Sequence, residues 1–167
     1  MDLRLLSRML LFSLLWAVSV GLTESQSRFS PQEPQDKSKC PVCGMFVVEY
    51  PRWWSEIIYE DGTTRIFDGP KDMVKYFLRP GLYEEKKGVK IAQMYVRDYY
   101  TLHWINARQA WYVAESDVYG PMGNEMVPLE SQEDALEFRQ DHQGKTILRF
   151  HEIDWDLLMR ISEGDTM

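Results

Sequence analysis

The sequence predicts an α+β fold made of two similar strand–strand–helix–strand units with mainly antiparallel sheets. Two observations indicate this class. Short apolar runs alternate with turn residues, and each of two longer stretches contains a helical pattern that begins at a capping residue and ends at glycine or proline. The length of 167 residues suits one domain or two small ones sharing a core, and 44% hydrophobic residues are enough to build that core.

The start of the chain resembles a secretory signal. Arg4 and Arg8 precede the apolar run 9–22, which is shorter than the roughly 20 apolar residues that a membrane helix needs. We therefore expect residues 1–22 to be a signal peptide or a retained N-terminal anchor, and the protein to be periplasmic, either free or held at the membrane. Residues 23–39 are rich in Ser, Gln, Pro and charge, which predicts a flexible tether before a folded domain at 40–167.

The first predicted unit begins with a hairpin. Residues 55–59 and 63–67 have the composition of strands, and the Asp-Gly pair between them is a hairpin turn signal. Asp68 is placed to cap a helix that ends at a Pro-Gly pair, and residues 91–96 are the expected third strand.

The second predicted unit has the same order of elements. Residues 110–114 and 125–129 are expected strands. Ser131 is placed to cap a helix, with Asp134 at the capping-box position, and residues 146–150 are the closing strand.

The two units look like diverged copies, covering about residues 40–98 and 99–153. Their helices align at a constant offset, so that Asp72 matches Asp134. The alternative is that any α+β domain shows such an echo by chance.

The strongest chemical signal is the motif Cys-Pro-Val-Cys-Gly-Met at 40–45, which contains both cysteines of the chain. Thiolate and thioether are soft ligands that favour Cu(I) over hard cations. In an extended segment, Cys43 and Met45 would point to the same face, whereas Cys40 would lie at the edge of the tether. The motif therefore predicts a soft-metal site to which Cys43 contributes more than Cys40.

Two other interpretations of the motif stay open. Cys40 and Cys43 are the expected redox pair if the protein is a thiol–disulfide oxidoreductase, and the expected disulfide if it is a non-catalytic accessory subunit. A structural zinc site normally takes four Cys or His ligands, and no second pair is present. The residues Phe46–Val48 after the motif have the composition of a strand, unlike the strand-to-helix turn of a thioredoxin-like site.

A second signal is Met122, which lies between Pro121 and Gly123 in an expected loop. Methionine usually fills cores, but a glycine-rich loop places it poorly for packing and well for reaching out. The formal net charge of -7 argues against nucleic-acid binding. Because the sequence has no phosphate-binding glycine loop and no Ser/His nucleophile motif, we expect a binding protein and no enzyme.

In their order and spacing, these motifs resemble the NosL family. The resemblance rests on Cys43–Val47, on the stretches 95–98, 104–107 and 110–113, and on the Met-Gly-Asn-Glu sequence at 122–125. It implies an exported Cu(I) carrier that serves assembly of the copper centres of nitrous oxide reductase, working with a membrane-bound transporter-type maturation complex.

The resemblance also implies a set of ligands. Carried over by position, Cys43 and Met45 would bind the metal, and Met122 is the best further candidate. Cys40 is a thiol that many members lack, which leaves either a two-thiol site or a redox lock on metal release. This sequence also lacks the lipid-bearing cysteine of many members.

Overall fold

A computed structural model describes residues 29–83 and 88–163. The expected signal or anchor at 1–22, and residues 23–28 of the expected tether, lie outside the described residues. Every element below belongs to the compact unit Pro31–Met167. Within the described ranges, no helix has the length and apolar character that crossing a membrane requires.

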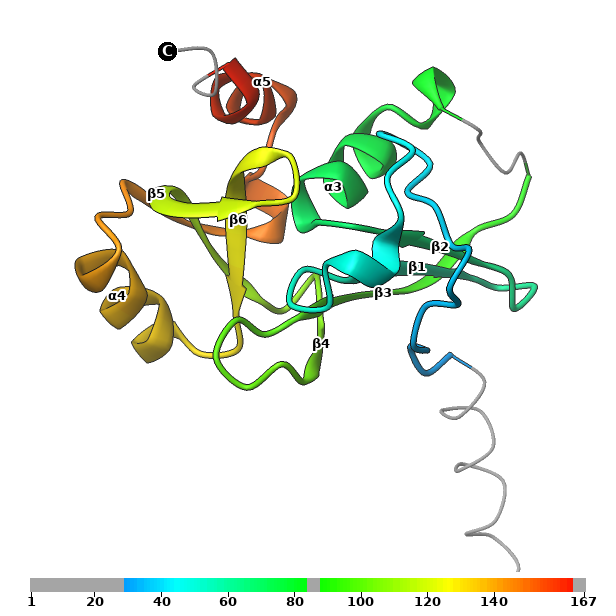
Figure 1. The fold of residues 1–167 in the computed structure, drawn as a ribbon, viewed down its shortest axis with the longest axis horizontal. Coiled ribbons are helices and arrows are strands. Elements are labelled where there is room, and N and C mark those ends of the chain that lie inside the picture. The colour runs from blue at the N-terminus through cyan, green and yellow to red at the C-terminus, as the bar shows by residue number, and fades with distance from the viewer. Residues whose placement is uncertain (1–28, 84–87, 164–167) are drawn as a thin grey trace, which may run out of the picture. The chain divides into compact units, whose positions relative to one another are not determined.

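The first sheet is four-stranded and antiparallel, in the order β2-β1-β3-β4 (Figure 1). Its strands are β1 (Ser55–Tyr59), β2 (Thr64–Phe67), β3 (Ile91–Arg97) and β4 (Trp104–Asn106). The predicted hairpin turn forms between β1 and β2. Gly62 has a φ of +83° there, and its N–H donates to the Tyr59 carbonyl at 2.9 Å. Every residue of β1 is buried, so this strand forms the centre of the sheet.

The second sheet is three-stranded and antiparallel, in the order β6-β5-β7. Its strands are β5 (Trp111–Gly120), β6 (Gly123–Leu129) and β7 (Thr146–Arg149). In both sheets the first strand of the unit lies between the second and the third, so the two units share one topology. The short strand β4 follows residue 98 in the chain but pairs with β3, so the first sheet extends beyond the expected limit at 98. The predicted α+β class with antiparallel sheets is confirmed.

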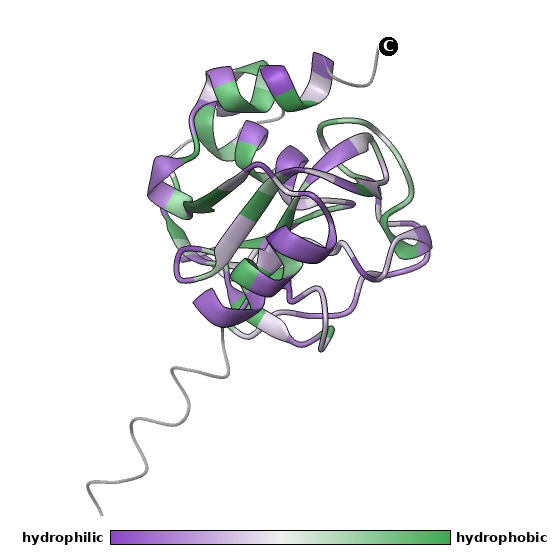
Figure 2. Ribbon diagram, turned by 90° about the vertical axis from the view of Figure 1, so that its left-hand side faces the viewer, coloured by the Kyte–Doolittle hydropathy of each residue, from purple (hydrophilic) through white to green (hydrophobic). Residues whose placement is uncertain are grey.

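The α-helices of the described residues are α3 (Pro70–Leu78), α4 (Gln132–Asp141) and α5 (Trp155–Glu163). α4 begins as predicted, because Ser131 Oγ accepts the Asp134 N–H at 3.0 Å. α3 begins differently, with Gly69 as its N-cap, so the capping role predicted for Asp68 is wrong. Figure 2 shows green and purple positions alternating along α5, consistent with the burial of one face of this helix against the core.

The buried residues form two adjoining clusters, and β5 contributes to both. Tyr112 packs in the larger cluster, with β1, β3, α3 and α5, and Val113 packs in the smaller one, beneath α4. Neighbouring residues of a strand face opposite sides of the sheet, so one strand can serve two cores. Cys40 belongs to the larger cluster, which places the start of the cysteine motif inside the fold.

The folded unit begins earlier in the sequence than predicted. The Gln32 N–H donates to Glu56 Oε2 at 2.9 Å, and the Glu33 carboxylate pairs with the Arg97 guanidinium. Lys39 forms an antiparallel bridge with Phe46. The expected boundary at residue 40 was therefore placed too late, because the polar composition of residues 31–39 conceals contacts that are made largely by the backbone.

We expect a chain that begins at Ser38 to be less stable than one that begins at Ser30. The shorter chain loses the hydrogen bond from Gln32 to Glu56, and such a bond contributes about 0.5–1.5 kcal/mol. Urea unfolding of the two chains measures the difference in the free energy of unfolding. Equal midpoints would restore the interpretation of residues 30–37 as a tether.

Candidate metal centre

The cysteine motif forms a closed loop. The Gly44 N–H donates to the Cys40 carbonyl and the Cys40 N–H donates to the Met45 carbonyl, both at 2.9 Å. Gly44 has a φ of +79°, a conformation that glycine adopts without strain. The segment is therefore not extended, and the expected common strand face of Cys43 and Met45 is wrong. The strand expected after the motif is wrong as well, since Val47–Glu49 form the 3-10 helix η1.

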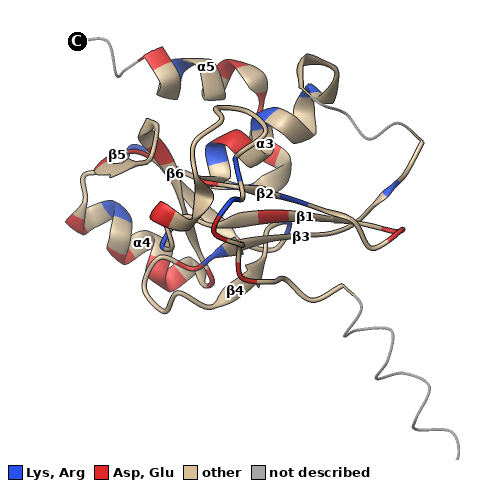
Figure 3. Ribbon diagram, turned by 45° about the vertical axis from the view of Figure 1, so that its right-hand side comes forward, with Lys and Arg blue, Asp and Glu red and all other residues tan. Residues whose placement is uncertain are grey.

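The loop brings both thiols to the beginning of α3. Cys40 Sγ donates to Asp72 Oδ2 at 3.4 Å, and Cys43 Sγ donates to Asp68 Oδ2 at 3.2 Å. One ligand atom from each of these four residues lies within 4.8 Å of the other three. We call these four residues the thiol–carboxylate cluster. Figure 3 shows acidic and basic positions next to each other where α3 begins.

Most of the cluster is buried. Cys40, Asp68 and Asp72 expose 2%, 1% and 3% of their surface, whereas Cys43 is only half-buried. The cluster therefore opens towards solvent at Cys43. Within the described chain, Asp68 Oδ1 is buried and has no hydrogen-bond partner.

The negative groups of the cluster oppose one another. Burial raises the pKa of Asp72, and the nearby Asp68 carboxylate raises it further, although Lys75 Nζ, 3.6 Å from Asp72 Oδ1, acts in the opposite direction. The hydrogen bond with Cys43 raises the pKa of Cys40 far above its ordinary value, and burial and the two carboxylates act in the same direction. A cation at the centre of the cluster would relieve this repulsion and favour the thiolates.

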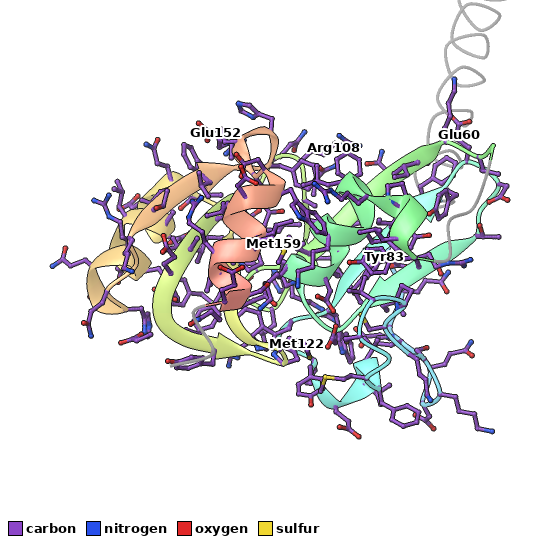
Figure 4. The ribbon with its side chains drawn as sticks, turned by 90° about the horizontal axis from the view of Figure 1, so that it is seen from above. Glu60, Tyr83, Arg108, Met122, Glu152 and Met159 are labelled. Atoms are coloured by element: carbon purple, nitrogen blue, oxygen red, sulfur yellow. The ribbon has the colours of Figure 1, made fainter. Side chains whose placement is uncertain are left out.

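A buried lysine holds the Met122 loop at the same end of α3. Lys71 is fully buried, and its Nζ donates to the Met122 carbonyl at 2.8 Å and to the Asn124 carbonyl. Figure 4 shows Met122 at the tip of the β5–β6 hairpin, on the side of the molecule where residues 40–49 lie. Met122 exposes 43% of its surface, so it reaches outward as expected, whereas Met126 is fully buried.

Glu125 fixes the same hairpin to the helix. Its Oε1 accepts the N–H of Lys71 at 2.7 Å and that of Met126 at 2.9 Å. Since Lys71 lies in the first turn of α3, the carboxylate satisfies one of the amides that a helix leaves unpaired at its start. A Cβ at Gly69 would lie 2.4 Å from Glu125 Oε2, and one at Gly120 would lie 2.9 Å from Glu125 Cβ. Glycine at these two positions gives the Glu125 side chain its space.

The structure thus brings Cys40 and Cys43 together with two carboxylates that the sequence analysis did not assign to the site. Asp68 was expected only to cap a helix. The available signal in the sequence was two aspartates, Asp68 and Asp72, four residues apart around the start of a predicted helix. The chain's three histidines do not belong to the cluster.

We expect Glu125→Gln to flatten the pH dependence of stability. Burial raises the pKa of Glu125 from 4.5 to about 8, although Lys71 lowers it. The folded state therefore binds more protons between these pH values, and this contribution to stability is lost as the pH rises towards 8, by at most about 1.4 kcal/mol per pH unit. Urea unfolding of both proteins between about pH 5 and pH 8 measures the two slopes of unfolding free energy against pH.

Glu56 and Asp72 also have raised pKa values, and they contribute equally to the pH dependence of stability in both proteins. Parallel profiles would show that Glu125 does not titrate in this range.

Comparison with known proteins identifies the family. Residues 31–158 match the sequence model of NosL. Over 143 residues the chain is 28% identical to the copper-binding lipoprotein NosL of Stutzerimonas stutzeri, covering 81% of this chain and 72% of the relative. The crystal structure of the copper chaperone NosL from Shewanella denitrificans superposes with a TM-score of 0.66 at 27% identity, covering 76% of this chain and 97% of that chain. The solution structure of apo-NosL from Achromobacter cycloclastes is 25% identical, covers 62% of this chain and 87% of that chain, and has a TM-score of 0.46. Because the sequence model spans most of the folded unit, the chain belongs to the NosL family.

Proposed function

We propose that this protein is a periplasmic Cu(I) chaperone that carries copper for assembly of the copper centres of nitrous oxide reductase. The observation that carries this proposal is that the two thiol sulfur atoms lie within 4.8 Å of each other, with Cys43 half-buried and Cys40 buried. Thiolates are soft ligands that suit Cu(I). The names of the relatives, a copper-binding lipoprotein and a copper chaperone, support the proposal.

The proposed ligands are the thiolates of Cys40 and Cys43, joined by the thioethers of Met45 and Met122. Met45 follows the thiols within the closed loop, and Lys71 holds the Met122 loop at the end of α3 where the thiols lie. Thioethers do not form disulfides, which is an advantage for a protein exported to an oxidising compartment. The sequence predicted that Cys43 contributes more to metal binding than Cys40. That prediction assumed that Cys43 shares a strand face with Met45 and that Cys40 lies at the edge of a flexible tether. Neither is present, so we assign copper to both thiols.

The arrangement also suits transfer of the metal. The exposed side of the cluster carries Cys43, and the exposed hairpin tip carries Met122, whereas Cys40 is held from behind by Asp72. A recipient could therefore approach at Cys43 and exchange its ligands for those of the carrier. The recipient in this proposal is nitrous oxide reductase, or the membrane transporter-type complex that matures it.

A thiol–disulfide oxidoreductase is the competing function, since Cys40 and Cys43 are separated by two residues. A redox nucleophile normally has its pKa lowered by a cation or a helix N-terminus. The pKa of Cys40 is instead raised by its hydrogen bond with Cys43, by burial and by two carboxylates. An anaerobic Cu(I) titration against a competing chelator, together with an insulin reduction assay, separates the two functions. Tight one-to-one copper binding supports the chaperone, and insulin reduction without copper binding supports the oxidoreductase.

We expect Cys43→Ser and Cys40→Ser each to lower Cu(I) affinity by at least about tenfold, because loss of a ligand should cost no less than loss of an outer partner. Both affinities are measured by chelator competition on reduced protein without oxygen. A loss confined to Cys43→Ser would remove Cys40 from the site and restore the original ranking.

We expect Met122→Leu to lower Cu(I) affinity more than Met126→Leu. Both changes keep an apolar side chain of similar volume, so each should change the free energy of unfolding by less than about 1.5 kcal/mol. Of these two methionines, Met122 is exposed at the hairpin tip and Met126 is buried, so Met126 serves as the matched control. X-ray absorption of the bound copper should show one sulfur neighbour fewer in the Met122 variant. An unchanged sulfur count together with an unchanged affinity would make Met122 an ordinary loop residue.

A further inference from the structure

Glu56 is a buried acidic residue on the face of β1 that is directed away from the larger core. Its neighbour Ile57 packs in the larger buried cluster, and neighbouring residues of a strand face opposite sides of the sheet. Glu56 nevertheless exposes only 2% of its surface. It accepts hydrogen bonds from the Gln32 N–H, at 2.9 Å, and from the Thr64 side chain, and both donors are uncharged. Burial with such partners makes the ionised form of Glu56 costly.

A cavity of about 670 Å³ lies between this face of the sheet and the start of the folded chain. Glu56 and residues 64–66 of β2 line one side of it, and residues 32–35, 38 and 39 line the other. Cys40 and two further residues of the cysteine loop also line the cavity. The same space therefore adjoins both the buried carboxyl group and the buried thiol.

Two contacts hold residues 31–37, which we call the N-terminal latch, against the sheet. The first is the hydrogen bond from the Gln32 N–H to Glu56. The second is the pair between the Glu33 carboxylate and the Arg97 guanidinium, which lies between two tryptophan rings with centroids at 5.0 and 4.5 Å. The Glu33 side chain is largely exposed, and ion pairs at exposed positions contribute little to stability. The contact with Glu56 is thus the buried one of the two.

The latch leads directly into the cysteine loop. The Val47 N–H donates to the Ser38 carbonyl at 3.0 Å, and Lys39 forms a bridge with Phe46. The residues that follow the latch therefore close the loop that contains both thiols. Because Cys40 comes next in the chain and lines the cavity, release of the latch would open a path for solvent to this thiol.

We propose that the N-terminal latch is a pH-dependent cover on the cavity beside Cys40, closed while Glu56 is protonated and released when Glu56 ionises. A protonated carboxyl group lies beneath the closed latch without a charge that needs solvation. Release of the latch admits water, which solvates the carboxylate. The inference concerns the thiol without metal, so it does not rest on the proposed copper function.

The electrostatics of Glu56 agree with this direction. Burial raises the pKa of Glu56 from 4.5 to about 7, although its hydrogen bonds with Gln32 and Thr64 lower it. A raised pKa favours the closed form when Glu56 is protonated, so closure is strongest below about pH 4.5 and weakens as the pH rises towards 7. The other titratable or charged groups around Glu56 are Glu33, Lys39, Cys40 and Arg65, which line the cavity, and Tyr95, which pairs with Glu56 from β3.

Amide hydrogen exchange of the whole chain, reduced and without metal, tests the latch. The exchange rate of the peptide 31–39 in wild-type protein is divided by the rate in Glu56→Gln at each pH, which cancels the intrinsic pH dependence of exchange. The variant keeps an oxygen for the Gln32 N–H but cannot ionise. We expect the ratio to rise by at least about threefold from pH 5 to pH 8, within the limit of about tenfold per pH unit for one group. A ratio that stays flat would overturn the proposal.

Three controls make the result specific. Glu137→Gln removes the same charge from an exposed position on α4 and should match wild-type protein at every pH. Glu33→Gln removes the second contact of the latch and should speed exchange by a similar factor at every pH. Within wild-type protein, exchange of residues 31–39 relative to α4 must show the same rise, so the test does not depend on a variant that folds. An equal rise in α4 would show global opening instead and would overturn the latch.

Alkylation of Cys40 by iodoacetamide, located by mass spectrometry, tests the connection to the thiol. The ratio of rates in wild-type protein and Glu56→Gln cancels the titration of Cys40 itself, because this thiol is present in both. We expect this ratio to rise over the same pH range as the exchange ratio. A constant alkylation ratio would show that the latch does not cover Cys40.

Discussion

The buried contact between the β5–β6 hairpin and the start of α3 is the constraint on which the site depends. Lys71 comes from the first unit, and its ammonium group is bound by carbonyls of the second unit. Glu125 comes from the second unit, and its carboxylate accepts the Lys71 amide of the first. Burying these ionisable groups would be unfavourable without such partners. The two sheets could pack through apolar surface alone, but this polar contact fixes how the hairpin meets the helix.

The beginning of α3 organises the site because its residues point in different directions. Asp68 precedes the N-cap Gly69 and Asp72 lies in the first turn, and both accept thiol hydrogen bonds. Lys71, between them in the sequence, is directed at the hairpin. The cysteine loop and the hairpin are about 80 residues apart in the chain, and this one helix end contacts both. Displacement of α3 would therefore disturb the thiols and the Met122 loop together. The close approach at Gly69 and Gly120 leaves little freedom for such displacement.

Features encoded by neighbouring residues could be predicted from the sequence. The bounds of β1 and the cap of α4 follow from local patterns, and both were predicted correctly. The conformation of Cys40–Met45 was predicted wrongly. The positive φ of Gly44 turns the chain at a point where the alternation of side chains suggests an extended segment. Asp72 is 32 residues from Cys40, and no local pattern reports their contact. The packing of residues 31–39 was missed for a similar reason, since a backbone amide such as that of Gln32 can bond whatever its side chain.

The cluster combines properties that the proposed carrier function needs and that a storage site would not. Full burial of all its ligands would slow metal exchange, whereas full exposure would leave the thiols open to oxidation. Here one thiol is enclosed in the core and the other is half-exposed, so under the proposed function Cys40 would hold the metal while the bond between the metal and Cys43 is exchanged. The carboxylates add a further effect, since the repulsion that disfavours the empty thiolate form is relieved only when a cation arrives. The same repulsion would work against retaining a thiolate once the metal had left, so that under the proposed function reprotonation of Cys40 would favour completion of the transfer.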